Sequence, residues 1–226
     1  MNPLYYNINQ EEVNHMERYI LCFGDTNTWG YNPDGSGRFP SNVRWTGLLQ
    51  KALSEIAPEI RVAEEGMNGR TTIFGEKLEP HRCGLPCVAP LVMTHKPLAA
   101  IIVMLGTNDT KDFLKASARE INMGMAQILR EIHWACASDG GVPPILLMSP
   151  KPLNADLNRG DFNLESAAKS AELASLYEAT AASFGCSFLD LGKVVPGTCL
   201  DGVHLNAEQH RIAADAIIEW VRSVLK

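Results

Sequence analysis

The 226-residue sequence lacks the features that would assign it to a membrane, secreted or nucleic-acid-binding class. Its apolar runs are strand-sized, far shorter than the roughly 20 residues that a transmembrane helix needs. The start of the chain is polar, whereas a signal peptide requires a basic start and an apolar centre. There is no run of Lys and Arg, and the net charge is −6. We therefore expect a cytoplasmic protein with neither a nucleic-acid nor a membrane partner.

Paired cysteine motifs are also absent, and the six cysteines are scattered. In a reducing compartment such cysteines are read as small buried hydrophobic residues. His81, Cys83 and Cys87 form a loose cluster, but their spacing does not match the Cys-x-x-Cys pairs of common zinc sites. Gly35 and Gly37 lack the third glycine of a dinucleotide-binding fingerprint and do not directly follow a strand. We expect no metal and no cofactor.

Linkers and internal repeats are missing as well, so nothing in the sequence divides the chain. A single domain of this length can bury a substantial core. The sequence also lacks Gly-x-Ser-x-Gly, the turn that carries the nucleophile of α/β-hydrolases. We predict a polar N-terminal arm over residues 1–17 and one domain over residues 18–226.

Within residues 18–226, short apolar runs alternate with helical patterns. The β-branched run at residues 99–105, bounded by Pro97 and Gly106, is typical of a central strand buried on both faces. Apolar residues at helical spacing over residues 45–56 predict an amphipathic helix. Such alternation indicates an α/β fold, with a parallel sheet between helical layers. The predicted strands are residues 18–23, 60–63, 99–105, 144–148 and 186–191, and the predicted helices are 45–56, 88–95, 117–137, 165–184 and 206–226.

Polar motifs follow four of the predicted strands. Gly-Asp-Thr at residues 24–26 follows the first strand, and Gly-Thr-Asn-Asp at residues 106–109 follows the third. A loop with Gly69 follows the second strand, and Asp-Gly-Val-His at residues 201–204 lies in the loop after the fifth. Because the carboxyl ends of parallel strands meet at one edge of a sheet, we expect these motifs to form one site. A hydroxyl, an amide and an Asp/His pair are the parts of an acyl-transfer centre.

The four motifs resemble, in order, the sequence blocks of the SGNH (GDSL-type) hydrolases, named for a Ser, a Gly, an Asn and a His. Phe-Gly-Asp-Thr at residues 23–26 resembles the first block, and Met-Asn-Gly-Arg-Thr at residues 67–71 the second. The motifs at residues 106–109 and 201–204 resemble the third and the last, and the similarity covers nearly the whole chain after about Arg18. This resemblance implies a flavodoxin-like three-layer α/β/α sandwich with a five-stranded parallel sheet.

Within the family, the chain is most similar to the arylesterase/acyltransferase branch. The similarity lies in Thr-Trp-Gly at residues 28–30, Val-Arg-Trp at 43–45, Glu-Glu-Gly at 64–66 and Asn-Asp-Thr-Lys at 108–111. It implies an esterase or acyltransferase acting on short-chain acyl esters, which are small-molecule substrates. Some enzymes of this branch pass acyl groups to alcohols or peroxide as well as to water. They also tend to be oligomers, so the resemblance implies a homo-oligomer.

The resemblance and the chemistry assign roles to individual residues. Thr26 is expected to be the nucleophile, His204 the general base, and Asp201 the residue that fixes the imidazole tautomer. The backbone N–H groups of Thr26 and Gly69 and the side-chain amide of Asn108 are expected to form the oxyanion hole.

Three further residues are candidates for the substrate pocket. Trp29 and Trp45 are candidates to line the acyl or alcohol pocket, with core packing as an equal alternative. Asp25 is expected to brace the loop beside the pocket rather than to act as an acid.

Thr26 departs from the family pattern, in which this residue is a serine. Threonine keeps the hydroxyl but adds a methyl group on Cβ, which stiffens χ1 and crowds the carbonyl under attack. The best-known threonine nucleophiles are N-terminal and are activated by their own amine, a route closed to an internal residue. Three interpretations stay open: a working but slow nucleophile, a substitution introduced into the sequence, or a catalytically weak or inactive carbohydrate- or ester-binding protein.

Overall fold

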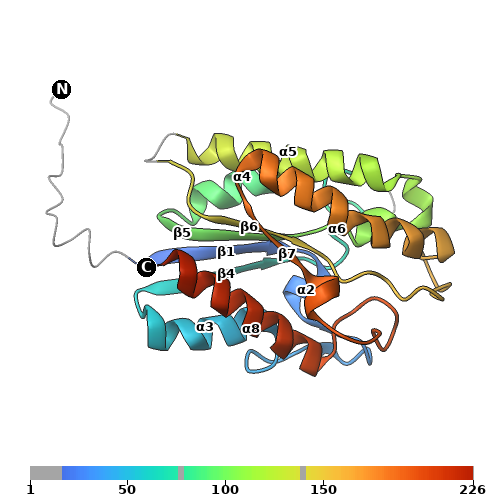
Figure 1. The fold of residues 1–226 in the computed structure, drawn as a ribbon, viewed down its shortest axis with the longest axis horizontal. Helices are drawn as coiled ribbons and strands as arrows, with labels where there is room; N and C mark the ends of the chain where they lie inside the picture. The colour runs from blue at the N-terminus through green and yellow to red at the C-terminus, as the bar shows by residue number, and fades with distance from the viewer. Residues whose placement is uncertain (1–16, 76–78, 138–140, 226) are drawn as a thin grey trace, which may run out of the picture.

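The computed structural model describes residues 17–75, 79–137 and 141–225. A five-stranded sheet lies between two layers of helices (Figure 1). The predicted polar arm, residues 1–17, lies outside the described residues except for Glu17. In the part of the chain that is described, no helix combines the length and apolar character needed to cross a membrane.

The sheet is parallel throughout, with the strand order β4-β1-β5-β6-β7. The predicted α/β fold with a five-stranded parallel sheet is therefore confirmed. Among the strands, the largest difference is at β4, which continues to Gly66, past its predicted end at Ala63, because Glu64 and Glu65 pair with Cys22 and Phe23 of β1. The strands are β1 (Arg18–Gly24), β4 (Ile60–Gly66), β5 (Leu98–Met104), β6 (Ile145–Ser149) and β7 (Ser187–Asp190).

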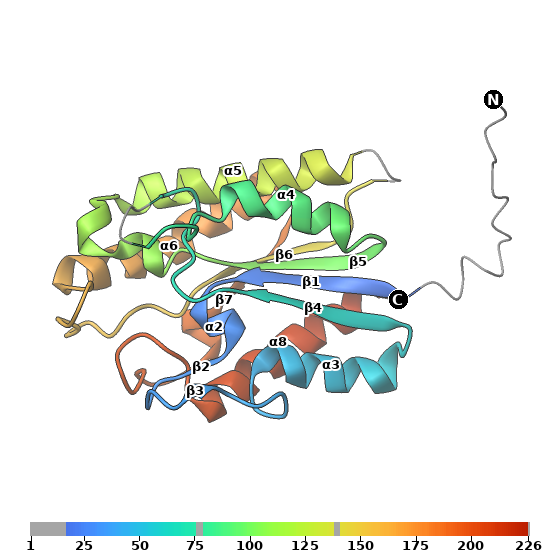
Figure 2. The same ribbon diagram turned by 180° about the vertical axis from the view of Figure 1, so that it is seen from behind.

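The central strand β1 is buried on both faces because side chains alternate along it. Leu21 and Phe23 pack into one apolar core, whereas Ile20 and Cys22 pack into the other. The first core joins the sheet to α4 (Leu85–Thr94), α5 (Ala118–Cys136) and α6 (Leu164–Phe184). The second joins it to α3 (Trp45–Ile56) and α8 (Ala207–Val224), on the opposite face (Figures 1 and 2).

The three long helices begin at capping residues that the sequence supplies. Ser117, Asn163 and Asn206 each form a capping box with the residue three positions later, which satisfies orphan N–H groups at the helix start. Helix α4 begins at Leu85, before its predicted start at Val88. Pro86 in its first turn is compatible with this start because the N–H that proline lacks has no partner there.

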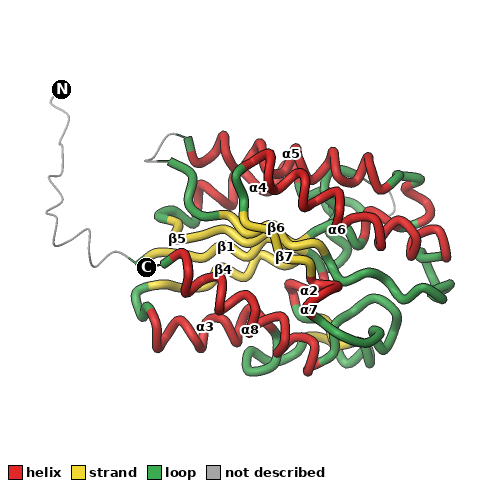
Figure 3. The backbone as a smooth tube through the Cα atoms, viewed as in Figure 1, coloured by secondary structure: helices red, strands yellow, loops and turns green. Residues whose placement is uncertain are grey.

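Short elements lie within stretches that the sequence presented as loops (Figure 3). Two-residue strands and single helical turns are too short to produce a hydrophobic period, so the sequence did not reveal them. The predicted loop 31–41 contains a small antiparallel hairpin. These elements are α2 (Thr26–Trp29), β2 (Tyr31–Asn32), β3 (Gly37–Arg38), η1 (Asn108–Thr110), η2 (Asp112–Leu114) and α7 (Leu191–Val194).

The chain order creates a switch point beside β1. From β1 the chain moves to β4 on one side, and it then crosses to β5 on the other side. Ligands of open α/β sheets bind outside the carboxyl ends of the strands at such a point. The turn after β1 and the turn after β5 carry Thr26 and Asn108, so both lie at this position.

Candidate active site

Thr26 is the first residue of the single-turn helix α2, directly after β1. The Asp25 side chain caps this helix by accepting a hydrogen bond from Asn27 N at 3.0 Å. Glycine is required at position 24, the last residue of β1, because a Cβ there would lie 2.0 Å from Thr28 Oγ1 and 2.8 Å from Met104 O. The Thr26 side chain is thus held on a closely packed turn, and the residue is 8% exposed.

His204 and Asp201 form the pair that their spacing predicted. Asp201 Oδ2 lies 2.6 Å from His204 Nδ1, and Asp201 Oδ1 accepts the backbone N–H groups of Val203 at 3.0 Å and His204 at 2.8 Å. Burial raises the pKa of Asp201, but the hydrogen bonds from His204 and Val203 outweigh it and leave the pKa below its ordinary value. The carboxylate is therefore built to remain ionised beside the imidazole.

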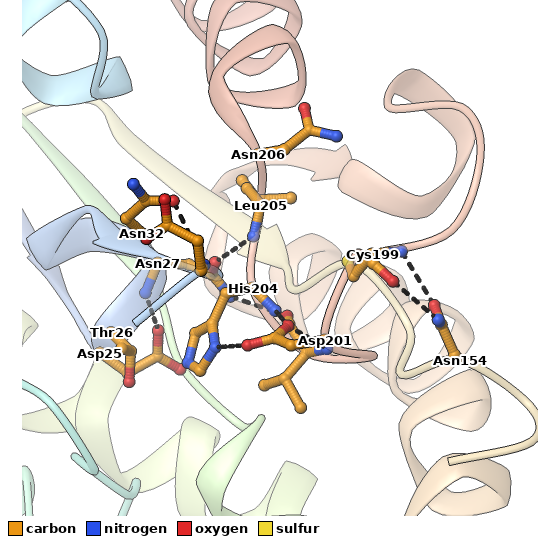
Figure 4. A network of polar contacts seen from close by, with 12 residues as sticks. Asp25, Thr26, Asn27, Asn32, Asn154, Cys199, Asp201, His204, Leu205 and Asn206 are labelled. Atoms are coloured by element: carbon orange, nitrogen blue, oxygen red, sulfur yellow. Dashed lines mark hydrogen bonds and ion pairs between the residues drawn. The ribbon is translucent and has the colours of Figure 1, made fainter. Parts of the chain in front are cut away.

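Two asparagines hold the Asp201–His204 loop from either end (Figure 4). Asn27 of α2 accepts Leu205 N–H at 2.9 Å and donates to Val203 O at 3.4 Å. Asn154 donates to Cys199 O at 2.8 Å and accepts Cys199 N–H at 2.9 Å. Neither role could be predicted from the sequence, because each contact joins segments far apart in the chain.

Gly69 lies against the Thr26 hydroxyl. Its backbone N–H donates to Thr26 Oγ1 at 3.4 Å, and its φ of +78° lies in the left-handed region that favours glycine. A Cβ here would also lie 3.3 Å from Arg82 Nε. The glycine therefore permits both the turn and the close approach of Arg82.

Asn108 is buried at the start of η1, after β5. Its Nδ2 donates to Arg70 O at 3.1 Å, which connects the turn after β5 to the loop after β4. An amide nitrogen carries two hydrogens, and this bond uses one of them. The loops of Gly69 and Asn108 therefore lie side by side, as their places at one sheet edge predicted.

Asp25 and Asp109 are buried carboxyl groups behind the site. Burial raises the pKa of Asp25 to about 6, although Asn27 N–H and the nearby His204 act in the opposite direction. Burial likewise raises the pKa of Asp109 to about 7, against hydrogen bonds from the Thr72 N–H and hydroxyl. Asp25 also raises the pKa of Asp109, so the two charges oppose each other.

The two tryptophans occupy different environments. Trp45 is 1% exposed in the core beneath the α3–α8 layer, and its Nε1 donates to Asn27 O at 3.1 Å. Trp45 therefore packs in the core rather than lining the substrate pocket, and its indole N–H holds the Asn27 carbonyl. Trp29 is partly buried, with the Arg38 guanidinium 5.3 Å from its ring centroid.

A cavity of about 330 Å³ opens beside His204. The Tyr31 ring forms one wall, with its centroid 4.7 Å from that of the His204 imidazole. Apart from the motif at residues 201–204, the sequence did not identify the lining residues, because they lie in stretches that looked like plain polar loops. The remaining lining residues are Pro33, Asp34, Gly35, Leu157, Arg159, Gly160, Asp161, Phe162, Asp201 and Val203.

The loose cluster of His81, Cys83 and Cys87 lies at the start of α4. Cys83 pairs through its backbone with Thr71, and Cys87 Sγ donates to Cys83 O at 3.8 Å. Across residues 17–75, 79–137 and 141–225, no three His, Cys, Asp or Glu side chains are grouped so that they could hold a metal ion.

Solved structures of esterases share the overall fold. The structure is similar to the native aryl esterase of M. smegmatis, with 34% identity, 92% of this chain and 100% of that chain covered, and a TM-score of 0.83. A carbohydrate acetylesterase from Sinorhizobium meliloti shares 31% identity, with 91% of this chain and 99% of that chain covered and a TM-score of 0.83. The search of the curated proteins found no match.

The family comparison covers most of the chain. The model of the GDSL-like Lipase/Acylhydrolase family matches residues 22–212, which include the turns of Thr26, Gly69 and Asn108 and the Asp201–His204 loop. Together with the solved esterase structures, this match identifies the chemistry as ester hydrolysis. The chain belongs to the GDSL-like lipase/acylhydrolase family and is an ester hydrolase of the SGNH type.

Proposed function

We propose that the protein cleaves short-chain acyl esters through a covalent acyl-enzyme on Thr26. The observation that carries this proposal is the 2.6 Å contact between Asp201 and His204 beside the Thr26 turn. Figure 4 draws the His204 imidazole between Asp201 and the Asp25–Thr26 turn. An imidazole held at Nδ1 by a carboxylate has its Nε2 free to act as a base, which is the arrangement that a hydroxyl nucleophile needs.

The proposed reaction has two halves. In the first, His204 Nε2 removes the Thr26 proton while Oγ1 bonds to the acyl carbon, and the same proton then passes to the leaving alcohol. In the second, His204 activates a water molecule that breaks the acyl–Oγ1 bond and restores the hydroxyl. Asp201 retains the Nδ1–H bond throughout and stabilises the transient imidazolium.

The oxyanion of each tetrahedral intermediate needs fixed donors. The backbone N–H groups of Thr26 and Gly69 and the second hydrogen of the Asn108 amide supply them in this proposal. Support comes from the Gly69 N–H, which already lies 3.4 Å from Thr26 Oγ1, next to the position that the oxyanion takes. Removal of one such donor typically costs about 10²–10³ in rate.

Threonine at position 26 makes the proposed nucleophile slow rather than absent. The hydroxyl is present, but its Cβ methyl is confined on a turn where Thr26 is 8% exposed. A misplacement of about 1 Å in the reacting atoms can cost on the order of 10² in rate. We therefore expect low activity that rises when the methyl is removed.

The cavity beside His204 favours acyl transfer to alcohols as a second activity. Tyr31 and Phe162 supply apolar walls in a volume of about 330 Å³ next to the proposed base. An alcohol held there would compete with water for the acyl-enzyme. The solved relatives named for aryl esters and carbohydrate acetates suggest an alcohol portion with a ring.

The test is turnover of p-nitrophenyl acetate by the protein and by its Thr26→Ser and Thr26→Ala forms. We expect measurable turnover from the protein, a gain of about 10-fold or more in the Ser form, and none above background in the Ala form. Absence of turnover from both the protein and the Ser form would refute the proposal and leave a binding protein. For acyl transfer, vinyl acetate with benzyl alcohol in water should yield benzyl acetate, whereas acetate alone refutes that second activity.

A further inference from the structure

One peptide unit connects the Thr26 hydroxyl to a positive charge. The N–H of this unit belongs to Gly69 and donates to Thr26 Oγ1 at 3.4 Å. Its carbonyl oxygen belongs to Asn68 and accepts a hydrogen bond from Arg82 Nη1. Arg82 therefore acts on the opposite end of the peptide group whose N–H is a proposed oxyanion donor.

The backbone around Arg82 is fixed to the same loop. Thr71 N–H donates to Arg82 O at 3.0 Å, and Gly84 N–H donates to Thr71 O at 3.1 Å. The Arg82 side chain is partly buried and packs against Gly69, where a Cβ would lie 3.3 Å from Nε and 3.4 Å from Cδ. Arg82 is thus held in place by both its backbone and its side chain.

A cation on a carbonyl oxygen changes the whole amide. Hydrogen bonds to a charged donor are roughly twice as strong as neutral ones. Hydrogen bonds in a chain polarise one another, and the effect is larger where water is partly excluded. Electron density drawn toward Asn68 O leaves the Gly69 N–H more positive and thus a stronger donor to an anionic oxygen.

We infer that Arg82 is a positioning residue of the oxyanion hole. It fixes the plane of the Asn68–Gly69 peptide and strengthens the Gly69 N–H as a donor, without contacting the substrate. The inference rests on the proposed acyl-enzyme chemistry at Thr26. Because an oxyanion exists only in the transition state and the intermediates, Arg82 acts on kcat rather than on KM.

Two substitutions separate the charge of Arg82 from its packing. Arg82→Met keeps an unbranched stem against Gly69 but removes the charge and the donors. Arg82→Lys keeps a charge and a donor without the planar fork. Arg61→Met is the matched control, because Arg61 Nη1 also donates to a carbonyl, Pro58 O at 2.6 Å, but near the start of β4, away from the site.

The kinetic readout is p-nitrophenyl acetate turnover, measured in the protein and again in its Thr26→Ser form. Complete loss of an oxyanion donor costs about 10²–10³ in rate, so weakening one should cost Arg82→Met about tenfold in kcat with KM unchanged. Arg82→Lys should recover part of that loss, and Arg61→Met should match the parent. A raised KM with unchanged kcat, or equal losses in the Lys and Met forms, would overturn the inference.

A second readout needs no turnover. The amide nitrogen of a residue senses hydrogen bonding at the preceding carbonyl, so the Gly69 ¹⁵N resonance reports directly on Arg82. It should move in Arg82→Met, move less in Arg82→Lys and stay in place in Arg61→Met. An unchanged Gly69 resonance in Arg82→Met would contradict the inference even if activity fell. Turnover that survives His204→Ala would instead refute the proposed function, while the Gly69 resonance would still decide the role of Arg82.

Discussion

Two aspartates lie close to His204, and their pKa values are shifted in opposite directions. Asp201 accepts three hydrogen bonds, from His204 Nδ1 and from two backbone N–H groups. Asp25 accepts one backbone N–H, from Asn27, and the nearby Thr107 hydroxyl also acts to lower its pKa. Burial raises the pKa of Asp25 to about 6, whereas the pKa of Asp201 lies below its ordinary value.

The difference follows from burial as well as from the number of donors, and of the two carboxyl groups it is Asp201 that contacts the imidazole, 2.6 Å from Nδ1. An ionised carboxylate in a buried site needs several donors to offset the loss of water. Asp201 has them because a tight turn aims consecutive N–H groups at Oδ1. Asp25 acts instead as the cap of α2, a role in which the protonated form serves as well.

The largest expected effect separates the two residues by activity. Asp201→Asn should lower kcat for p-nitrophenyl acetate by about 10³–10⁴, because an amide favours the wrong imidazole tautomer. Asp25→Asn should lower kcat by less than about tenfold, since an amide oxygen can still accept Asn27 N–H. Steady-state kinetics with circular dichroism as the folding control would measure both.

Equal losses of kcat in Asp201→Asn and Asp25→Asn would contradict the different roles assigned to the two aspartates. That result would mean that Asp25 also supports the imidazole as an ion. A loss in Asp25→Asn alone would reverse the assignment and make Asp25 the partner of His204.

The next effect is on stability. The pKa of Asp25 rises from its ordinary 3.8 to about 6, so the folded state keeps a proton that the unfolded state releases. Unfolding free energy therefore falls as the pH rises from about 4 to above 6, by about 3 kcal/mol for this group. Asp25→Asn should stabilise the protein at pH 8 and have little effect at pH 4, as measured by urea unfolding.

Asp109 provides the internal control for this pH effect. Its pKa is about 7, raised mainly by burial and in smaller part by Asp25, so it contributes a slope of the same sign that is reduced but not removed in Asp25→Asn. Asp109→Asn should remove that slope separately and at slightly higher pH. If the unfolding free energy depended on pH in the same way in the parent and in Asp25→Asn, the pKa of Asp25 would be the same in the folded and unfolded states.

The sequence predicted the parts of the site that are encoded locally. Asp201 and His204 lie three residues apart, and the turns with Thr26, Gly69 and Asn108 each follow a recognisable strand, so their meeting followed from sheet topology. The contacts that align these parts are long-range: Asn27 contacts Leu205 across the molecule. Long-range side-chain contacts leave no periodicity or spacing in a sequence, and Asn154 and Arg82 were missed for the same reason.

The third prediction concerns the link between the two compared regions. Asn27 donates its N–H to Asp25 and holds both neighbours of His204 with its side chain. Asn27→Ala should release the His204 loop from α2 and lower kcat by about 10², the cost of a misplacement of about 1 Å. Asn122→Ala is the matched control, because Asn122 accepts a bond from Thr180 at 2.8 Å in the α5–α6 layer. Equal kinetics in both variants would show that Asp201 alone positions the imidazole.

The smallest effect is expected at Tyr31, whose ring contacts the His204 imidazole while Asp201 binds Nδ1. The ring centroids are 4.7 Å apart at 48°, a tilted contact of the kind worth about 0.5–1.5 kcal/mol. Tyr31→Phe should therefore keep kcat, whereas Tyr31→Ala should lower kcat/KM by no more than about tenfold. Combined with Asp201→Asn, Tyr31→Ala should cost more than it does alone, because the ring then loses both restraints. Additive losses in this double-mutant cycle would mean that Tyr31 shapes only the cavity, and that Asp201 by itself sets the orientation of His204.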